Sequence, residues 1–145
     1  MSIFADSSAL VKLYVEEPGS PAVDELAGLV VSQLARVEVP AALWRLRRTR
    51  ELGASATRTA VDAFVSDYSG GRRNRPRFTV VSLSDAVLGD AATLTGVRGL
   101  RAYDAVQLAS ARAAAAVDDR VRVFAAFDRQ LRAAAAEEGF VLVPS

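Results

Sequence analysis

The sequence SIFADSSALVKLYV, residues 2–15, joins a short apolar run to a helical pattern through one acidic residue. Residues 3–5 form the run, and Asp6 follows it without a spacer. Apolar residues then recur with helical spacing, at Leu10, Val11, Tyr14 and Val15. The pattern predicts a buried strand, a carboxylate at its end, and a helix capped by Ser7 or Ser8.

The same alternation of apolar runs and helical segments continues along the chain. Further strands are predicted at 29–31, 78–81, 121–127 and 140–143. Helices are predicted at 20–26, 35–50, 54–68, 84–94, 102–117 and 129–138, with Gly53 ending the second of these and a Gly-, Asn- and Pro-containing loop at 70–76. Continuous apolar strands between helices are typical of a mostly parallel sheet covered on both faces. We therefore expect a single α/β domain over residues 1–145.

Composition narrows the chemistry that such a domain performs. The 145 residues include no His and no Cys, although 24% are charged. Serine–histidine triads, cysteine nucleophiles, disulfides and Cys/His zinc sites are therefore excluded. Carboxylates without imidazole favour hard cations such as Mg²⁺ or Mn²⁺.

No stretch of the sequence approaches the ~18 apolar residues of a membrane span. The first twenty residues have acidic residues where a secretory signal has basic ones, so they do not resemble a signal peptide. We expect a cytoplasmic protein with no membrane partner.

Four acidic residues stand where an α/β fold places its cleft. Asp6 and Asp128 directly follow predicted strands, Asp104 lies in the first turn of a helix, and Glu38 lies early in another helix. Taken singly, each has a structural explanation as a helix cap, a dipole partner or a surface acid. In open α/β sheets, however, ligands bind at the carboxyl ends of the strands, where these acids are expected to meet.

Gathered carboxylates repel one another, by about 4 kcal/mol per pair at ~4 Å and an effective dielectric of 20. Such a group takes up protons or binds a cation. A bound divalent metal acidifies water and stabilises charge on phosphoryl oxygens. The acids therefore point to metal-assisted hydrolysis of a phosphodiester.

Four segments of the chain, in order, resemble PIN-domain ribonucleases, and in particular the VapC-type toxins of bacterial toxin–antitoxin pairs. They are DSSALVKLY (6–14), SQLARVEVPAALW (32–44), LRAYDAVQLA (100–109) and FAAFDRQL (124–131). The resemblance implies a PIN-like fold and a metal-dependent endoribonuclease. Its site residues would be Asp6, Glu38, Asp104 and Asp128, which would bind one or two Mg²⁺ or Mn²⁺ ions.

The resemblance also implies partners, and the chain departs from the family's usual residues at two positions. It implies an RNA substrate, a homodimer, and inhibition by a VapB-like antitoxin whose C-terminal segment occupies the cleft. Relatives often have His where this chain has Gln107, and Thr or Ser where it has Ala126. Neither position is one of the four acids, so the metal site is expected to survive both changes.

The charge distribution supports an RNA partner although the net charge is only +1. Residues 36–77 contain ten arginines against four acidic residues, a local charge of +6. Solvated helix faces would produce the same pattern. Arg45, two turns beyond Glu38 on one helical face, and the arginines of the loop, Arg72, Arg73, Arg75 and Arg77, are candidate phosphate contacts.

Two other functions share part of this pattern. A phospho-accepting receiver domain also has aspartates at strand ends, but it needs a lysine at the end of a late strand, and Lys12 is the sole lysine. A PIN-like module that binds metal or RNA without catalysis would not require four mutually repelling carboxylates.

Overall fold

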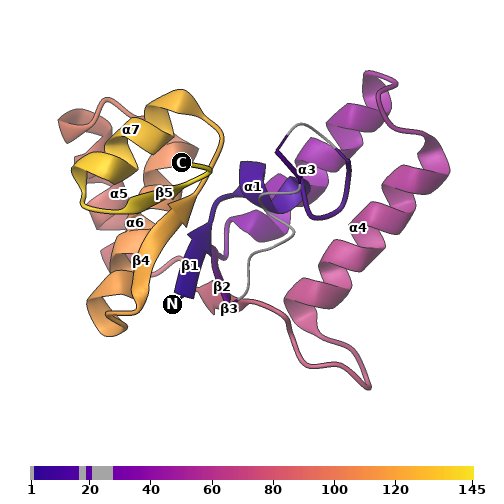
Figure 1. Ribbon diagram of the computed structural model, residues 1–145, viewed down its shortest axis with the longest axis horizontal. Coiled ribbons are helices and arrows are strands. Elements are labelled where there is room, and N and C mark those ends of the chain that lie inside the picture. Colours follow the sequence, from indigo (N-terminus) through magenta and orange to yellow (C-terminus); the bar gives the residue numbers. More distant parts are fainter. Residues whose placement is uncertain (1, 17–18, 21–27) are drawn as a thin grey trace.

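The computed structural model describes residues 2–16, 19–20 and 28–145, which form a five-stranded sheet (Figure 1). The strands run in the order β3-β2-β1-β4-β5, and all neighbouring pairs are parallel. Their bounds are β1 Ser2–Ala5, β2 Leu29–Ser32, β3 Thr79–Val81, β4 Val121–Ala125 and β5 Val141–Val143. The predicted α/β architecture with a parallel central sheet is confirmed.

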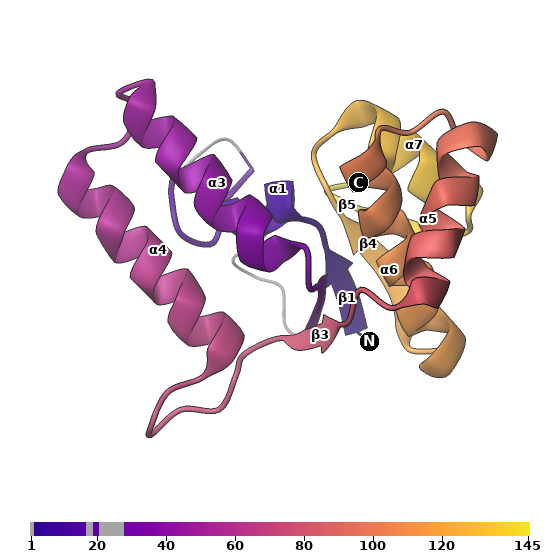
Figure 2. The same ribbon diagram turned by 180° about the vertical axis from the view of Figure 1, so that it is seen from behind.

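Helices cover both faces of this sheet, as Figures 1 and 2 show from opposite sides. On one side lie α1 (Ser7–Val11), α3 (Ala35–Arg48) and α4 (Ala54–Ser69). On the other lie α5 (Asp85–Val97), α6 (Ala102–Val117) and α7 (Arg129–Glu137). The helix predicted at 20–26 lies, apart from Ser20, outside the described residues.

Alternating side chains of the strands divide the core into two layers. Phe4 and Phe124 face α5, α6 and α7, and their rings stack with centroids 5.3 Å apart. Their neighbours Ala5 and Ala125 face the opposite layer with α1, α3 and α4. A side chain such as Phe4 is fully buried and contributes about 1.5–3 kcal/mol by leaving water. This two-sided burial explains why the strands contain continuous apolar runs.

Three local predictions need correction. The strand predicted as buried at 78–81 is the edge strand β3, with Thr79 exposed, because only one neighbour and few helical residues cover it. Gly53 does not end the helix before it: α3 ends at Arg48 with Thr49 as its cap, and Gly53 precedes α4 as that helix's N-cap. Asp6, rather than Ser7 or Ser8, caps α1.

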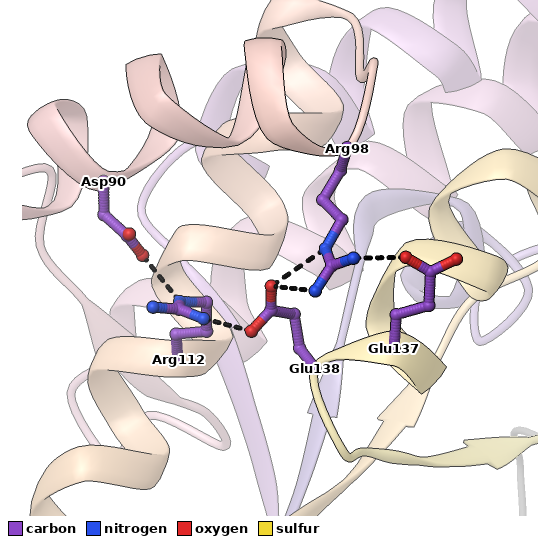
Figure 3. Close-up of polar contacts among 5 residues, drawn as sticks. All are labelled: Asp90, Arg98, Arg112, Glu137 and Glu138. Atoms are coloured by element: carbon purple, nitrogen blue, oxygen red, sulfur yellow. Dashed lines mark hydrogen bonds and ion pairs between the residues drawn. The ribbon is translucent and has the colours of Figure 1, made fainter.

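An ion-pair network ties the three helices of one layer together (Figure 3). Glu138, at the end of α7, binds Arg98 at the end of α5, with a 3.0 Å hydrogen bond from Nε, and also binds Arg112 of α6. Arg112 in turn binds Asp90 of α5 at 2.8 Å, and Arg98 binds Glu137. The network therefore fixes α5, α6 and α7 relative to one another.

No helix in the described part of the chain combines the length and the apolar character needed to cross a bilayer.

Candidate functional site

Asp6 stands at the carboxyl end of the central strand β1 and is only 4% exposed. Its Oδ1 accepts hydrogen bonds from the Ser8 hydroxyl at 2.7 Å and from the Ala9 backbone N–H at 2.9 Å. The second bond is the N-cap bond of α1, which holds the carboxylate at the edge of the sheet. The Ser8 hydroxyl, a candidate cap of this helix in the sequence, contacts the site acid itself.

The other three predicted acids reach the same place from different elements. Glu38 lies in the first turn of α3, which follows β2, and Asp104 lies in the first turn of α6. Asp128 follows β4 and caps α7, with its Oδ1 accepting from the Leu131 N–H at 2.9 Å. All four acids line one pocket of about 250 Å³. Asp6, Glu38 and Asp128 converge because they follow parallel strands, whose carboxyl ends meet at one edge, and the start of α6 brings Asp104 to the same edge.

The electrostatics of this pocket oppose negative charge. Burial, with smaller contributions from the charges of Glu38 and Asp104, raises the pKa of Asp6 to about 7, although the hydrogen bonds from Ser8 and Ala9 act in the opposite direction. Burial also raises the pKa of Asp104, with a further increase from the Asp128 charge that Arg101 partly offsets. The pocket is therefore a place where a cation would stabilise the ionised carboxylates.

Arg101, a residue that the sequence did not single out, supplies such a cation. Its guanidinium lies 3.4 Å from Asp104 and 3.6 Å from Asp128, although its side chain is 76% exposed. Within residues 2–16, 19–20 and 28–145, no group of three or more acids is arranged so that it would hold a metal ion as it stands. The acids thus surround the pocket without forming a closed ligand set. One signal in the sequence could have identified Arg101: it lies three residues, about one helical turn, before Asp104.

A ring of three hydrogen bonds holds Glu38. Its Oε1 accepts from the Ser7 hydroxyl at 2.9 Å and from the Gln107 Nε2 at 2.7 Å. The same Nε2 also donates to the Ser7 hydroxyl oxygen at 3.0 Å. Gln107 is 2% exposed, and its Oε1 is buried without a hydrogen-bond partner. Ser7 was not predicted as a site residue, and no local pattern marks it.

Positive charge adjoins the acids. Arg45 lines the acidic pocket, as its helical spacing from Glu38 predicted. It also lines a neighbouring recess of about 350 Å³ together with Lys12 and Phe127. The Lys12 Nζ lies 4.4 Å from the centre of the Phe127 ring. A polyanion crossing the acidic pocket would therefore meet cationic side chains along its rim.

The donor set of the pocket fits a hard divalent cation. Every charged side chain of the pocket that is able to ligate a metal is a carboxylate. Imidazole and thiolate ligands are absent because the sequence contains no His and no Cys. Burial and the neighbouring carboxylates raise the pKa of Asp6, so a cation in the pocket would stabilise its ionised form. The residues that would hold Mg²⁺ or Mn²⁺ are Asp6, Glu38, Asp104 and Asp128.

Comparison with known proteins identifies the fold. No family model and no curated protein matches the sequence. Among solved structures, PAE2754 from Pyrobaculum aerophilum is 23% identical with a TM-score of 0.62, over 99% of this chain and 84% of that one. VapC20 of Mycobacterium tuberculosis, a toxin that cleaves the sarcin-ricin loop, is 17% identical with a TM-score of 0.63, over 97% of both chains.

A toxin–antitoxin complex from Klebsiella pneumoniae is 15% identical with a TM-score of 0.54, over 88% of this chain and 87% of that one. At these identities the similarity concerns the course of the backbone, and it spans nearly the whole chain. The chain therefore has the PIN-like α/β fold found in VapC-type toxin structures, as its sequence predicted.

Proposed function

We propose that the protein is a metal-dependent endoribonuclease and acts as the VapC-type toxin of a toxin–antitoxin pair. The observation that carries the proposal is the meeting of Asp6, Glu38, Asp104 and Asp128 in one pocket at the carboxyl edge of the sheet. Asp6, Glu38 and Asp128 come from three separate strand–helix units, and Asp104 comes from the start of a fourth helix. Capping alone explains Asp6 and Asp128, but it does not explain why Glu38 and Asp104 face the same pocket.

One or two Mg²⁺ or Mn²⁺ ions, when bound, would supply an acidified water and stabilise charge on the phosphoryl oxygens. The chain's own groups prepare the pocket for them. The raised pKa values of Asp6 and Asp104 show that both are disfavoured as anions, so a nearby cation would stabilise them. Arg101 is weakly held, because exposed ion pairs contribute only about 0–1 kcal/mol, so it is able to move from the carboxylates to the RNA phosphate.

Binding of RNA is supported by charge rather than by base-reading groups. Arg45, the arginine of the basic segment 36–77 that lines the pocket, would contact the phosphate backbone. Such contacts provide affinity and position without selecting a sequence. The RNA target is therefore left to be mapped by sequencing the ends that the purified protein generates.

The proposed partners follow from the same relationship. The toxin–antitoxin complex with this fold supports binding of a VapB-like antitoxin, with a C-terminal segment of the antitoxin occupying the acidic pocket. A homodimer acting in the cytoplasm completes the proposal. Copurification with the product of a short adjacent gene, followed by size determination with light scattering, tests both associations.

Cleavage of total RNA tests the central claim. Purified protein is expected to cut RNA with Mg²⁺ or Mn²⁺ and to lose activity in EDTA. Asp6→Asn and Asp104→Asn should each reduce the rate by at least about 100-fold, since even outer-shell changes at metal sites cost 10–100-fold. Asp85→Asn, which neutralises an exposed acid of α5 outside the pocket, is the matched control and should leave the rate unchanged. Undiminished cleavage in EDTA would refute the metal mechanism.

The same experiment separates the alternatives. A PIN-like module without catalysis would bind RNA or Mn²⁺ and cut neither total RNA nor any purified RNA. The receiver-domain hypothesis lacks structural support, because Lys12 caps the end of α1 and is not at the end of a strand. A mass increase of one phosphoryl group after incubation with acetyl phosphate would support the receiver-domain hypothesis.

A further inference from the structure

Gln107 contacts the site without belonging to the acidic set. It projects from α6, one turn beyond Asp104, and reaches Glu38 of α3 and Ser7 of α1. The orientation of its amide is determined by these neighbours, because the reversed amide would place two acceptor oxygens about 2.7 Å apart. Both protons of Nε2 are used, one on the Glu38 carboxylate and one on the Ser7 hydroxyl.

This arrangement leaves the other end of the amide unsatisfied. The Gln107 Oε1 is buried and has no hydrogen-bond partner. An unpaired buried acceptor destabilises a fold by about 1–3 kcal/mol, which an apolar side chain of similar size would avoid. Fold stability alone therefore does not favour glutamine at this position. What glutamine provides is the pair of donors that face Glu38 and Ser7.

These contacts determine how the Glu38 carboxylate is held. Two donors, the Ser7 hydroxyl and the Gln107 amide, converge on its Oε1. In the hydrogen bonds of the described residues, Glu38 Oε2 accepts none, and it is the oxygen left for a ligand in the acidic pocket. Glu38 is otherwise a half-buried helical glutamate with a flexible side chain, so the ring removes most of its rotamer freedom.

We infer that Gln107 is a positioning residue: together with Ser7 it fixes Glu38 so that one carboxylate oxygen is presented to the divalent cation. The inference rests on the proposed metal site, and it adds residues that hold a ligand rather than act as one. Outer-shell hydrogen bonds of this kind orient metal ligands and strengthen binding. These hydrogen bonds order the ligand side chain when the protein folds, so less conformational entropy is lost when the cation binds.

Affinity for Mn²⁺, measured by electron paramagnetic resonance on the metal-free protein without RNA, tests the inference directly. Gln107→Met keeps the side-chain length and removes the amide, and it should weaken Mn²⁺ binding about tenfold. Its melting temperature should stay within about 3 °C of the wild type, because the lost hydrogen bonds are offset by removal of the orphaned acceptor. Gln33→Met is the matched control: the exposed side chain of Gln33 accepts a hydrogen bond from the Leu83 N–H, and its loss should leave Mn²⁺ affinity unchanged.

Two further variants show whether Gln107 acts through Glu38. Ser7→Ala removes the second donor and should also weaken Mn²⁺ binding, at least about threefold, which provides a test independent of how Gln107→Met folds. In a Glu38→Ala background, adding Gln107→Met should have no further effect on affinity, since the two residues act as one unit.

The outcomes separate this inference from the proposed function. If wild-type protein binds no Mn²⁺, the proposed metal site is refuted, and so is the positioning role that depends on it. If the wild type binds Mn²⁺ and both Gln107→Met and Ser7→Ala bind it equally well, the metal site stands and the positioning role is refuted. A tenfold loss that persists in the Glu38→Ala background would also refute it, because Gln107 would then act on the cation without Glu38.

Discussion

Asp6 combines two roles that usually require opposite environments. As the N-cap of α1 it accepts two hydrogen bonds that favour its ionised form, and at most helix starts such a carboxylate is fully charged. Here burial outweighs those bonds and raises the pKa of Asp6 to about 7. Near neutral pH the metal-free protein therefore carries a carboxyl group that is protonated in roughly half of the molecules.

This residue gives the metal-free protein a defined pH dependence. The pKa of Asp6 rises from an ordinary 3.8 to about 7 on folding, so between these values the folded state binds the proton more tightly than the unfolded state. Stability should therefore fall as pH rises from about 4 to 7, by up to about 4 kcal/mol, and then level off. Asp6→Asn retains the Oδ1 acceptor and cannot ionise, so it should be the more stable protein at pH 8.

Urea unfolding in EDTA at pH 5 and pH 8 measures the difference. The gap in unfolding free energy between the two pH values should shrink in Asp6→Asn and persist in Asp85→Asn, which neutralises an exposed carboxylate. Equal gaps in the wild type and Asp6→Asn would show that Asp6 is ionised in the folded protein at both pH values.

At the scale of elements, Glu138 connects α7 to two other helices. Its carboxylate binds Arg98 at the end of α5 and Arg112 of α6, and its side chain is only 13% exposed (Figure 3). Glu137, its neighbour, binds Arg98 alone and is 60% exposed. One acid therefore joins three helices, and the other adds a single surface pair.

Substitution distinguishes the two acids. Glu138→Ala leaves two arginines without their shared partner and should lower the free energy of unfolding by about 1–3 kcal/mol, between the values typical of exposed and buried pairs. Glu137→Ala should lower it by less than about 0.5 kcal/mol. Urea denaturation at low salt gives both values, and similar losses in the two variants would show that the network is not centred on Glu138.

At the scale of the whole molecule, the sheet separates two helical layers of different charge. Residues 36–77, which include α3 and α4, carry ten arginines and four acids, whereas the rest of the chain has more acids than bases. Arg45 is where the basic segment reaches the acidic pocket. The basic segment thus reaches the carboxylates through Arg45, whereas its loop before β3, residues 70–78, lies at the opposite end of the sheet (Figure 1).

Salt dependence of RNA binding reports this arrangement. For single-stranded RNA in EDTA, where no cleavage is expected, the affinity should fall with salt, and Arg45→Gln should reduce the slope of log K against log [salt] by about 0.7, the value for one phosphate contact. Arg122→Gln removes an exposed arginine of β4 outside the pocket and should leave the slope unchanged. Fluorescence anisotropy between about 50 and 200 mM salt measures both slopes. An unaltered slope in Arg45→Gln would place the RNA elsewhere.

Much of this architecture was predictable because it follows from local patterns. Apolar runs such as residues 3–5 become strands, and the helix predicted at 102–117 matches α6 at both ends. The edge position of β3 was not predictable, since the apolar residues 78–81 look the same whether one or two strands lie beside them. The sequence left the cap of α1 open among Asp6, Ser7 and Ser8, because all three are good cap residues and only the backbone angles select Asp6.

The sequence by itself determined the strand–helix alternation and placed each of the four acids at a strand end or a helix start, because these depend on residues within one or two turns. The tertiary structure alone decided how the acids are held. Gln107 and Ser7 are 100 residues apart, and Gln107 and Glu38 are 69 apart, yet they form one hydrogen-bonded ring. The raised pKa of Asp6 and the pairing of Arg101 with Asp128 likewise arise only when distant segments pack together, since burial and charge proximity are properties of the folded chain.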